Sequence, residues 1–165
     1  MQYPTLAICR EILFPYIRDR MATAEPAPSY EHERGLAKLE SAFHFMQRDE
    51  YEGLLGKASY LFCSIIDGHH FSNGNKRLAV VVLVYFLLIN NCKIHAPNMA
   101  VLRAELVRIF PNVKWEKIKA FRHAHEYFFY HLAIIIADRQ QKGNMTFTEE
   151  RVAVEQMLRV IVLRS

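Results

Sequence analysis

Hydrophobic side chains recur at steps of three and four residues along most of the chain, which is the spacing of amphipathic helices. No internal repeat, low-complexity stretch or domain linker interrupts this pattern. We therefore expect an all-α fold, a single-domain helical bundle. The spacing predicts helices over about 5–20, from Leu36 to Phe43 after Gly35, and over 54–66, 74–90, 99–110, 114–138 and 147–163, with a turn at 140–144.

Residues that favour helix ends support these boundaries. Side-chain oxygens satisfy the first N–H groups of a helix, whereas Gly and Pro stop or distort it. The signals are Pro15, which is expected to kink or end the first helix, Gly68 as a stop, Asn98 as a cap, and Thr146 with Glu149 as a capping box.

The helix at about 74–90 is expected to be buried at the centre of the bundle. Leu78 to Ile89 form a run without charged residues that is apolar on all sides. Because a membrane span needs about 20 such residues, this shorter run predicts a core helix.

Composition narrows the class of protein. A chain of 165 residues suits one domain, and 52% hydrophobic residues with only 6 Gly and 6 Pro exclude a disordered or collagen-like chain. The net charge of +4 favours phosphate-bearing ligands or nucleic acid without deciding between them. The 3 cysteines lack metal-ligand spacing, and the first residues lack the pattern of a signal peptide. We therefore expect a soluble, cytoplasmic protein with no membrane partner.

The most informative stretch is HHFSNGNKR at 69–77, between the two best-defined predicted helices. The second of these begins near Gly74, so its first backbone N–H groups have no partner within the helix and lie at the positive end of the helix dipole. Such a helix start binds anions, and glycine lets a phosphate approach the backbone. Lys76 and Arg77 add two cations at an end that disfavours them, a conflict that a bound anion would relieve.

His69 lies five residues before Gly74, in the expected loop. An imidazole beside a phosphate site can accept the proton of an incoming hydroxyl. Phe71 is expected to anchor the loop by placing its ring in the core. Together these residues predict attack of a hydroxyl on a bound phosphate.

The same stretch resembles the Fic/Doc signature, His-x-Phe-x-(Asp/Glu)-(Gly/Ala)-Asn-(Gly/Lys)-Arg. The Asn-Lys-Arg ending and the LA that follows it are similar to the Doc, or death-on-curing, branch, as is the upstream stretch RGLAKLESA at 34–42. The resemblance spans about 33–95 and implies one Fic/Doc-like domain over 1–165, with a family core at about 5–110 and a helical extension at 111–165. The six matching positions are His69, Phe71, Gly74, Asn75, Lys76 and Arg77.

This resemblance implies a transferase that modifies another protein with ATP as the donor. Fic proteins mostly transfer AMP to a Ser, Thr or Tyr hydroxyl, whereas Doc-like toxins act as protein kinases and have an antitoxin as partner. By motif match, the general base would be His69, the phosphate oxygens would be held by Gly74, Asn75 and Lys76, and the nucleotide phosphates would be clamped by Arg77. The family also has a flap that holds the target as an added strand, for which residues 24–35 are the candidate.

Asn73 departs from the family pattern. The family usually has Asp or Glu here to bind Mg²⁺, and an amide oxygen can ligate this ion but brings no negative charge. AMP-transferring members of the family often have Gly at the position where this chain has Lys76. A catalytically silent binding module with the same fold is therefore an alternative to the enzyme.

The last predicted helix resembles a self-inhibitory helix of some Fic proteins, Ser/Thr-x-x-x-Glu-(Gly/Asn), whose Glu pairs with the motif Arg. Thr146 and Glu150 match, whereas Arg151 breaks the last position. A capping box alone explains Thr146 and Glu149 without any regulation.

Two further patterns are weighed against ordinary explanations. A basic stretch at 114–122 keeps a basic helical nucleic-acid-binding protein as a third hypothesis, but such a stretch is usually a solvated helix face. Nucleic acid is therefore not the expected partner. Three histidines at 123–131 have spacings of two and six, unlike the i, i+4 pair of a zinc site.

Overall fold

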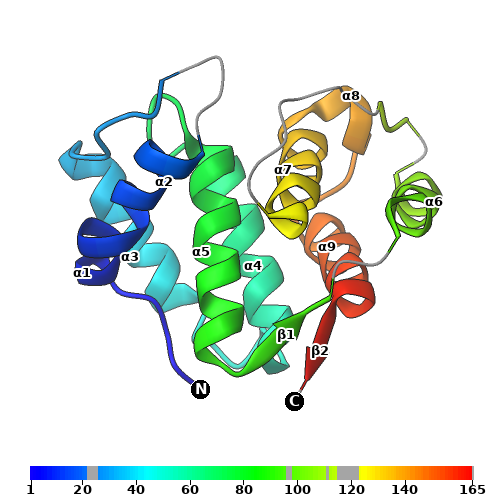
Figure 1. Ribbon diagram of the computed structural model, residues 1–165, viewed down its shortest axis with the longest axis horizontal. Helices are drawn as coiled ribbons and strands as arrows, with labels where there is room; N and C mark the ends of the chain where they lie inside the picture. The colour runs from blue at the N-terminus through cyan, green and yellow to red at the C-terminus, as the bar shows by residue number, and fades with distance from the viewer. Residues whose placement is uncertain (22–25, 96–97, 111, 115–122, 165) are drawn as a thin grey trace.

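The computed structural model describes residues 1–21, 26–95, 98–110, 112–114 and 123–164 (Figure 1). These residues form helices and one short antiparallel sheet of two strands, which confirms the all-α prediction. In chain order the elements are α1 (Leu6–Ile8), η1 (Cys9–Leu13), α2 (Phe14–Arg20), α3 (Glu33–Phe45), α4 (Gly53–Asp67), α5 (Asn75–Ile89), β1 (Cys92–Ile94), α6 (Met99–Ile109), α7 (Ala124–Ala137), α8 (Arg139–Lys142), α9 (Phe147–Ile161) and β2 (Val162–Arg164).

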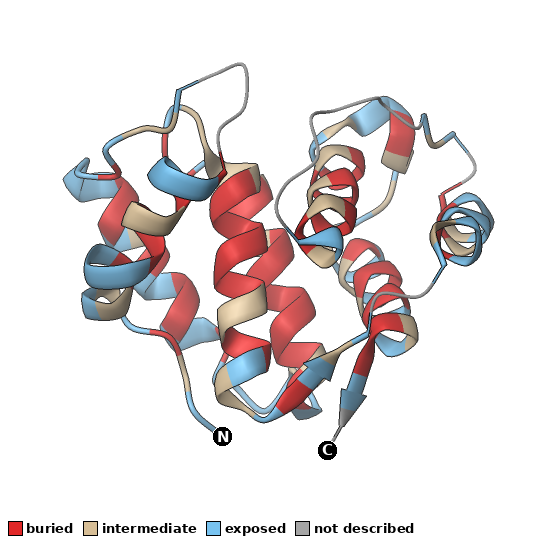
Figure 2. Cartoon of the chain, viewed as in Figure 1, coloured by how far each residue is buried: buried red, intermediate tan, exposed pale blue. Residues whose placement is uncertain are grey.

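Helices α4 and α5 lie side by side at the centre of the molecule (Figure 1). The N-terminal helices and α3 cover one side of this pair, and α7 and α9 cover the other. Figure 2 shows that most of α5 is buried, as its apolar run predicts. Fully burying a Val, Leu or Phe side chain contributes about 1.5–3 kcal/mol, so the buried apolar residues of α5 stabilise the core.

Pro15 neither ends nor breaks the first helical segment, which continues to Arg20. A π-helical turn, η1, precedes the proline, and the N–H of Phe14 donates to the carbonyl of Cys9 five residues back. Proline lacks an N–H and its ring clashes with the carbonyl four residues before it. The wider turn accommodates both effects, so the helix continues past Pro15 instead of ending there.

Three predicted boundaries in the helices are wrong. Helix α3 begins at Glu33 rather than after Gly35, because the His32 side chain caps it by accepting from the N–H of Gly35 at 3.3 Å. Helix α7 begins at Ala124, and Lys114, the predicted start, is not helical. The predicted turn at 140–144 contains most of the short helix α8.

The predicted helix-end signals are otherwise confirmed. Gly68 is the C-cap of α4, and Asn98 Oδ1 accepts from the N–H of Ala100 at 2.9 Å. Thr146 and Glu149 form the complete capping box of α9. These signals act between neighbours in the chain, so the sequence alone predicts them.

The pairing of β1 with β2 is absent from the sequence prediction. Cys92 pairs with Arg164 and Ile94 with Val162, so the end of α5 is tied to the end of α9. Each strand has 3 residues, too few to show the alternation that identifies a strand.

Within the described part of the chain, no helix combines the length and the apolarity that a bilayer crossing requires. The 3 cysteines are buried and free, so no disulfide joins them.

Candidate functional site

The candidate site is the loop at 68–74, which joins the end of α4 to the start of α5. The Asn75 side chain holds this loop at its middle. Its Oδ1 accepts from the N–H of Phe71 at 3.0 Å, and its Nδ2 donates to the carbonyl of Phe71 at 2.6 Å. Both polar atoms of the Asn75 side chain are thus used in shaping the loop, which leaves its backbone N–H for a ligand.

Phe71 anchors the loop as predicted. Its side chain is buried. Its ring packs edge-to-face with the rings of Tyr30 and Phe14, with 5.1 Å and 6.4 Å between the centroids. Gly35 permits this contact, because a Cβ there would lie 2.6 Å from the Phe71 ring and 2.5 Å from the carbonyl oxygen of His70. The role of Gly35 is therefore to let α3 pack directly on the loop.

Gly74 has close neighbours within its own chain. It has a left-handed φ of 75°, and a Cβ there would lie 2.6 Å from both Pro28 Cδ and the Tyr30 hydroxyl. The Tyr30 hydroxyl donates to the Gly74 carbonyl at 3.0 Å. Residues 28–30 thus pack on the start of α5, and a close approach of a phosphate to Gly74 stays a prediction.

The start of α5 has the character of an anion site. Gly74 is its N-cap and has no side chain that could cap the helix, and among the described residues no other side chain is hydrogen-bonded to the first N–H groups. Lys76 lies in the first turn and is half-buried. These N–H groups therefore retain the partial positive charge of the helix dipole, to which an ammonium is added.

Arg77 is 2% exposed and contacts the chain before α3. Its guanidinium donates to the carbonyl of Met21 at 3.4 Å and to that of Pro26 at 3.2 Å. These bonds hold Met21, at the end of α2, and Pro26 next to α5. A role for Arg77 in clamping nucleotide phosphates stays a prediction.

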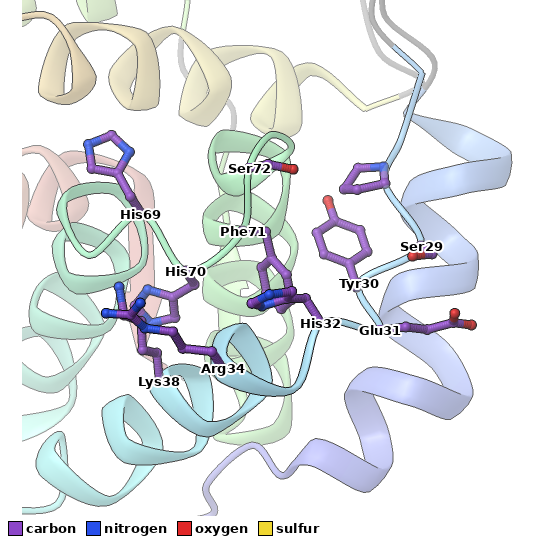
Figure 3. Close-up of a pocket in the computed structure, with 11 residues that line it drawn as sticks. Ser29, Tyr30, Glu31, His32, Arg34, Lys38, His69, His70, Phe71 and Ser72 are labelled. Atoms are coloured by element: carbon purple, nitrogen blue, oxygen red, sulfur yellow. The ribbon is translucent and has the colours of Figure 1, made fainter.

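His69 and His70 leave the loop in different directions (Figure 3). His69 is exposed and has a left-handed φ of 41°, which residues other than glycine rarely adopt. His70 is buried and lies beside Arg34 and Lys38 of α3 (Figure 3). Burial, together with the charge of Lys38, lowers the pKa of His70 to about 4, while the backbone of Gly68 acts in the opposite direction. His69 is thus the histidine that a substrate can reach.

A pocket of about 520 Å³ lies next to these histidines. Its walls are residues 28–32, the first two turns of α3 and loop residues 69–72. Residues 28–32 belong to the segment that the resemblance suggests as a target-holding flap. They therefore border the same space as His69.

Asn73 has an orphaned polar atom. Its Oδ1 is buried and has no hydrogen-bond partner among the residues that the structure describes. No group of three or more His, Cys, Asp or Glu side chains within the described ranges could hold a metal ion. An amide oxygen without a partner fits a single protein ligand to Mg²⁺, which commonly takes its other ligands from water and phosphates.

A second charged cluster joins the end of α4 to α8 and α9. Lys142 Nζ lies 3.4 Å from Asp67 Oδ1 and pairs with Glu150, whose side chain is 3% exposed. Burial raises the pKa of Glu150 to about 7, the nearby Asp67 adds to this, and Lys142 opposes it. The pKa of Lys142 is raised by Glu150 and Asp67, although burial alone would lower it.

This cluster corrects the self-inhibition hypothesis. The resemblance implied that Glu150 pairs with Arg77, but in this structure Glu150 pairs with Lys142. Thr146 caps α9, as the alternative explanation required. The sequence missed Lys142 because its ion pairs join segments far apart in the chain.

The remaining sequence hypotheses receive little structural support. Lys114 is exposed, and its N–H donates to Gln141 Oε1 at 2.9 Å. The rest of the basic stretch, 115–122, lies outside the described residues. His123 stacks on His125 with ring centroids 5.3 Å apart, and His131 is buried in α7, so packing accounts for these histidines.

Comparison with known proteins gives one match. No curated protein and no solved structure matches the chain, whereas residues 7–87 match the model of the Fic/DOC family. The matched segment ends within α5, so helices α6 to α9 lie outside it. The match to the Fic/DOC family thus includes the loop at 68–74, the start of α5 and every wall of the pocket.

Proposed function

We propose that this protein is a transferase that moves AMP or a phosphoryl group from ATP to a Ser, Thr or Tyr hydroxyl of another protein. The Fic/DOC match suggests a transferase in general. The observation that supports this proposal most is the exposed, left-handed His69 in the loop that leads to the uncapped start of α5. Unfavourable backbone conformations persist where the surrounding structure enforces them, and they cluster at functional sites.

In the proposed reaction, the backbone N–H groups of Gly74, Asn75 and Lys76 bind oxygens of the transferred phosphate, and the Lys76 ammonium adds charge stabilisation. His69 accepts the proton of the incoming hydroxyl, whose oxygen then bonds to phosphorus. Pyrophosphate leaves if the α-phosphorus is attacked, and ADP leaves if the γ-phosphorus is attacked. Arg77 stabilises the site through the hydrogen bonds that its guanidinium donates to the Met21 and Pro26 carbonyls.

A magnesium ion is part of this proposal. Asn73 Oδ1 would supply its protein ligand, since this atom is buried and no other described residue forms a hydrogen bond with it. Bound Mg²⁺ would neutralise charge on the donor phosphates.

The target protein is proposed to lie along residues 28–32. This segment borders the pocket beside His69 and is held on the start of α5 by Pro28 and Tyr30. An extended target backbone could pair with it as an added strand, which would bring the acceptor hydroxyl toward His69. A Doc-like toxin would in addition bind an antitoxin.

ATP labelled separately at the α- and γ-phosphorus tests the reaction with cell extract as the source of targets. Label retained only from the α position indicates AMP transfer, and label retained only from the γ position indicates phosphorylation. The His69→Ala variant should lose transfer by about 100-fold or more, because it removes the general base. His44→Ala, which removes an exposed histidine of α3, is the matched control. No labelled protein with Mg²⁺ or Mn²⁺ would contradict the proposal.

A second candidate function is a silent module that binds ATP without transferring it. It is favoured by the neutral Asn73 side chain at the position where the family carries an acid. It predicts ATP binding to the unmodified chain, no transfer, and a gain of transfer in Asn73→Asp. Transfer by the unmodified chain would exclude it.

A further inference from the structure

Two cations of α3 point into the pocket without an acidic partner. Arg34 and Lys38 are one helical turn apart and both line it (Figure 3). Among the described residues, no carboxylate lies within 4.0 Å of either charged group. Two like charges at this spacing repel each other and destabilise a helix. A bound anion would offset this repulsion.

A buried imidazole lies beside these cations. His70 is 8% exposed, and within the described structure its ring nitrogens make no hydrogen bond of good geometry, although the backbone of Gly68 lies close enough to raise its pKa. A buried polar group left without a partner costs about 1–3 kcal/mol. All three side chains line the same pocket (Figure 3), and the charge of Lys38 acts on His70 by lowering its pKa.

The position of the Lys38 ammonium is fixed by a hydrogen bond. Its Nζ donates to the carbonyl of Gly68 at 2.9 Å, two residues before His70. An ammonium has three N–H donors, so others remain for a ligand. Arg34 is exposed and can bind a carboxylate or a phosphate through two parallel hydrogen bonds.

We propose that Arg34, Lys38 and His70 form an anion-binding subsite on the α3 side of the loop, which accepts a carboxylate or phosphate group of a substrate. The subsite differs from the start of α5, since it uses side chains from α3 and the opposite side of the loop. An anion there would balance the charges of Arg34 and Lys38 and would lie against the ring of the buried His70. The volume of the pocket, about 520 Å³, leaves room for more than the anionic group.

This inference rests on the proposed function only for the identity of the substrate. His69 lines the same pocket, so an anion bound at the subsite lies close to the approaching hydroxyl. The anion is then either an acidic side chain of the target near its acceptor hydroxyl or a phosphate of the donor.

Inorganic phosphate is the probe for the subsite, and NMR of the isotope-labelled full chain is the measurement. Phosphate should shift the His70 ring signals saturably and raise the pKa of His70. Arg34→Gln should weaken the affinity at His70 about tenfold, since it removes a charge-assisted contact. Lys38→Gln should do the same. Arg10→Gln removes one exposed cation outside the pocket and should leave the affinity unchanged.

The backbone amide of Gly74 reports on the start of α5 in the same spectra. A separate subsite requires that Arg34→Gln weaken the response at His70 but not the response at Gly74. Equal weakening at both positions would mean one shared site and would overturn the proposal. So would an absence of any His70 response, or a response that is unchanged in Arg34→Gln. Because Arg34 is exposed, its variant keeps the test valid even if Lys38→Gln disturbs the loop.

Two competitors identify the source of the anion. A peptide with Glu next to Ser should displace phosphate from His70 if the subsite binds the target, and the matched Gln peptide should not. ATP should displace it if the subsite binds the donor. Displacement by neither would overturn the assignment to a substrate. These titrations require no transfer, so a failure of the labelled-ATP assay is a separate result.

Discussion

Two groups of charged residues flank the end of α4, and they differ in what surrounds their cations. Lys142 contacts Asp67 and Glu150, so its charge is balanced by carboxylates of the same chain. Lys38 contacts the neutral carbonyl of Gly68, and Arg34 nearby has no carboxylate partner among the described residues. The first group joins α8 and α9 to α4, whereas the second leaves positive charge facing a pocket. Similar side chains at neighbouring positions thus serve stability in one case and, by our proposal, ligand binding in the other.

Substitution of the two lysines should separate these roles most strongly. Lys142→Met leaves the buried Glu150 and the adjacent Asp67 without a cation, and should lower the free energy of unfolding by about 3 kcal/mol at pH 7. Lys38→Met removes one hydrogen bond to a carbonyl and should cost about 1 kcal/mol. Urea denaturation of both variants measures the difference. Equal losses would show that the two groups do not differ in the way proposed.

The pH dependence of stability tests the carboxylate-bearing group. The pKa of Glu150 is raised from 4.5 to about 7, so its contribution is fully present below 4.5 and is lost as the pH rises through about 7. His70 acts in the opposite direction, because its pKa is lowered to about 4 and stability falls as the pH drops toward that value. Comparison of the unmodified chain with Glu150→Gln isolates the first effect. Glu150→Gln should remove this fall in stability, which amounts to about 2 kcal/mol between pH 5 and pH 8. An unchanged pH profile would contradict this assignment.

Substitution of His69 should change the free energy of unfolding least. His69 has a φ of 41°, and glycine adopts this conformation without strain. His69→Gly should therefore raise the free energy of unfolding by about 0.5 kcal/mol, while it removes the proposed base. His44→Gly in the last turn of α3 is the control and should lower stability by about 1 kcal/mol, as glycine does in a helix. A loss of stability in His69→Gly would show that the strained conformation is not costly.

The sequence predicts those parts of the fold that depend on neighbouring residues. The core helix α5, the stop at Gly68, the capping box at Thr146 and the anchoring ring of Phe71 all follow from local patterns. The helix through Pro15 does not, because the π turn before it has no clear signature in residue type.

The motif predicts where the candidate site lies in the sequence. It does not predict the contacts that the site residues make in the fold. Asn75 uses its side chain within the loop, Gly74 makes room for residues 28–30, and Glu150 pairs with Lys142. Each of these contacts depends on which segments the fold brings together. The pairing of β1 with β2 was missed for the same reason, since it joins strands about 70 residues apart.

The bond from the Tyr30 hydroxyl to Gly74 has a consequence for the choice of acceptor. It fixes the segment at 28–32 at a set spacing from the first turn of α5. If a target chain lies along that segment, its backbone is held at a constant distance from the phosphorus, and only a side chain of suitable reach brings its oxygen there. The phenol of tyrosine extends several ångströms further than the hydroxyl of serine or threonine. A rigid spacing of this kind selects acceptors by side-chain length before any contact with the acceptor's neighbours is made.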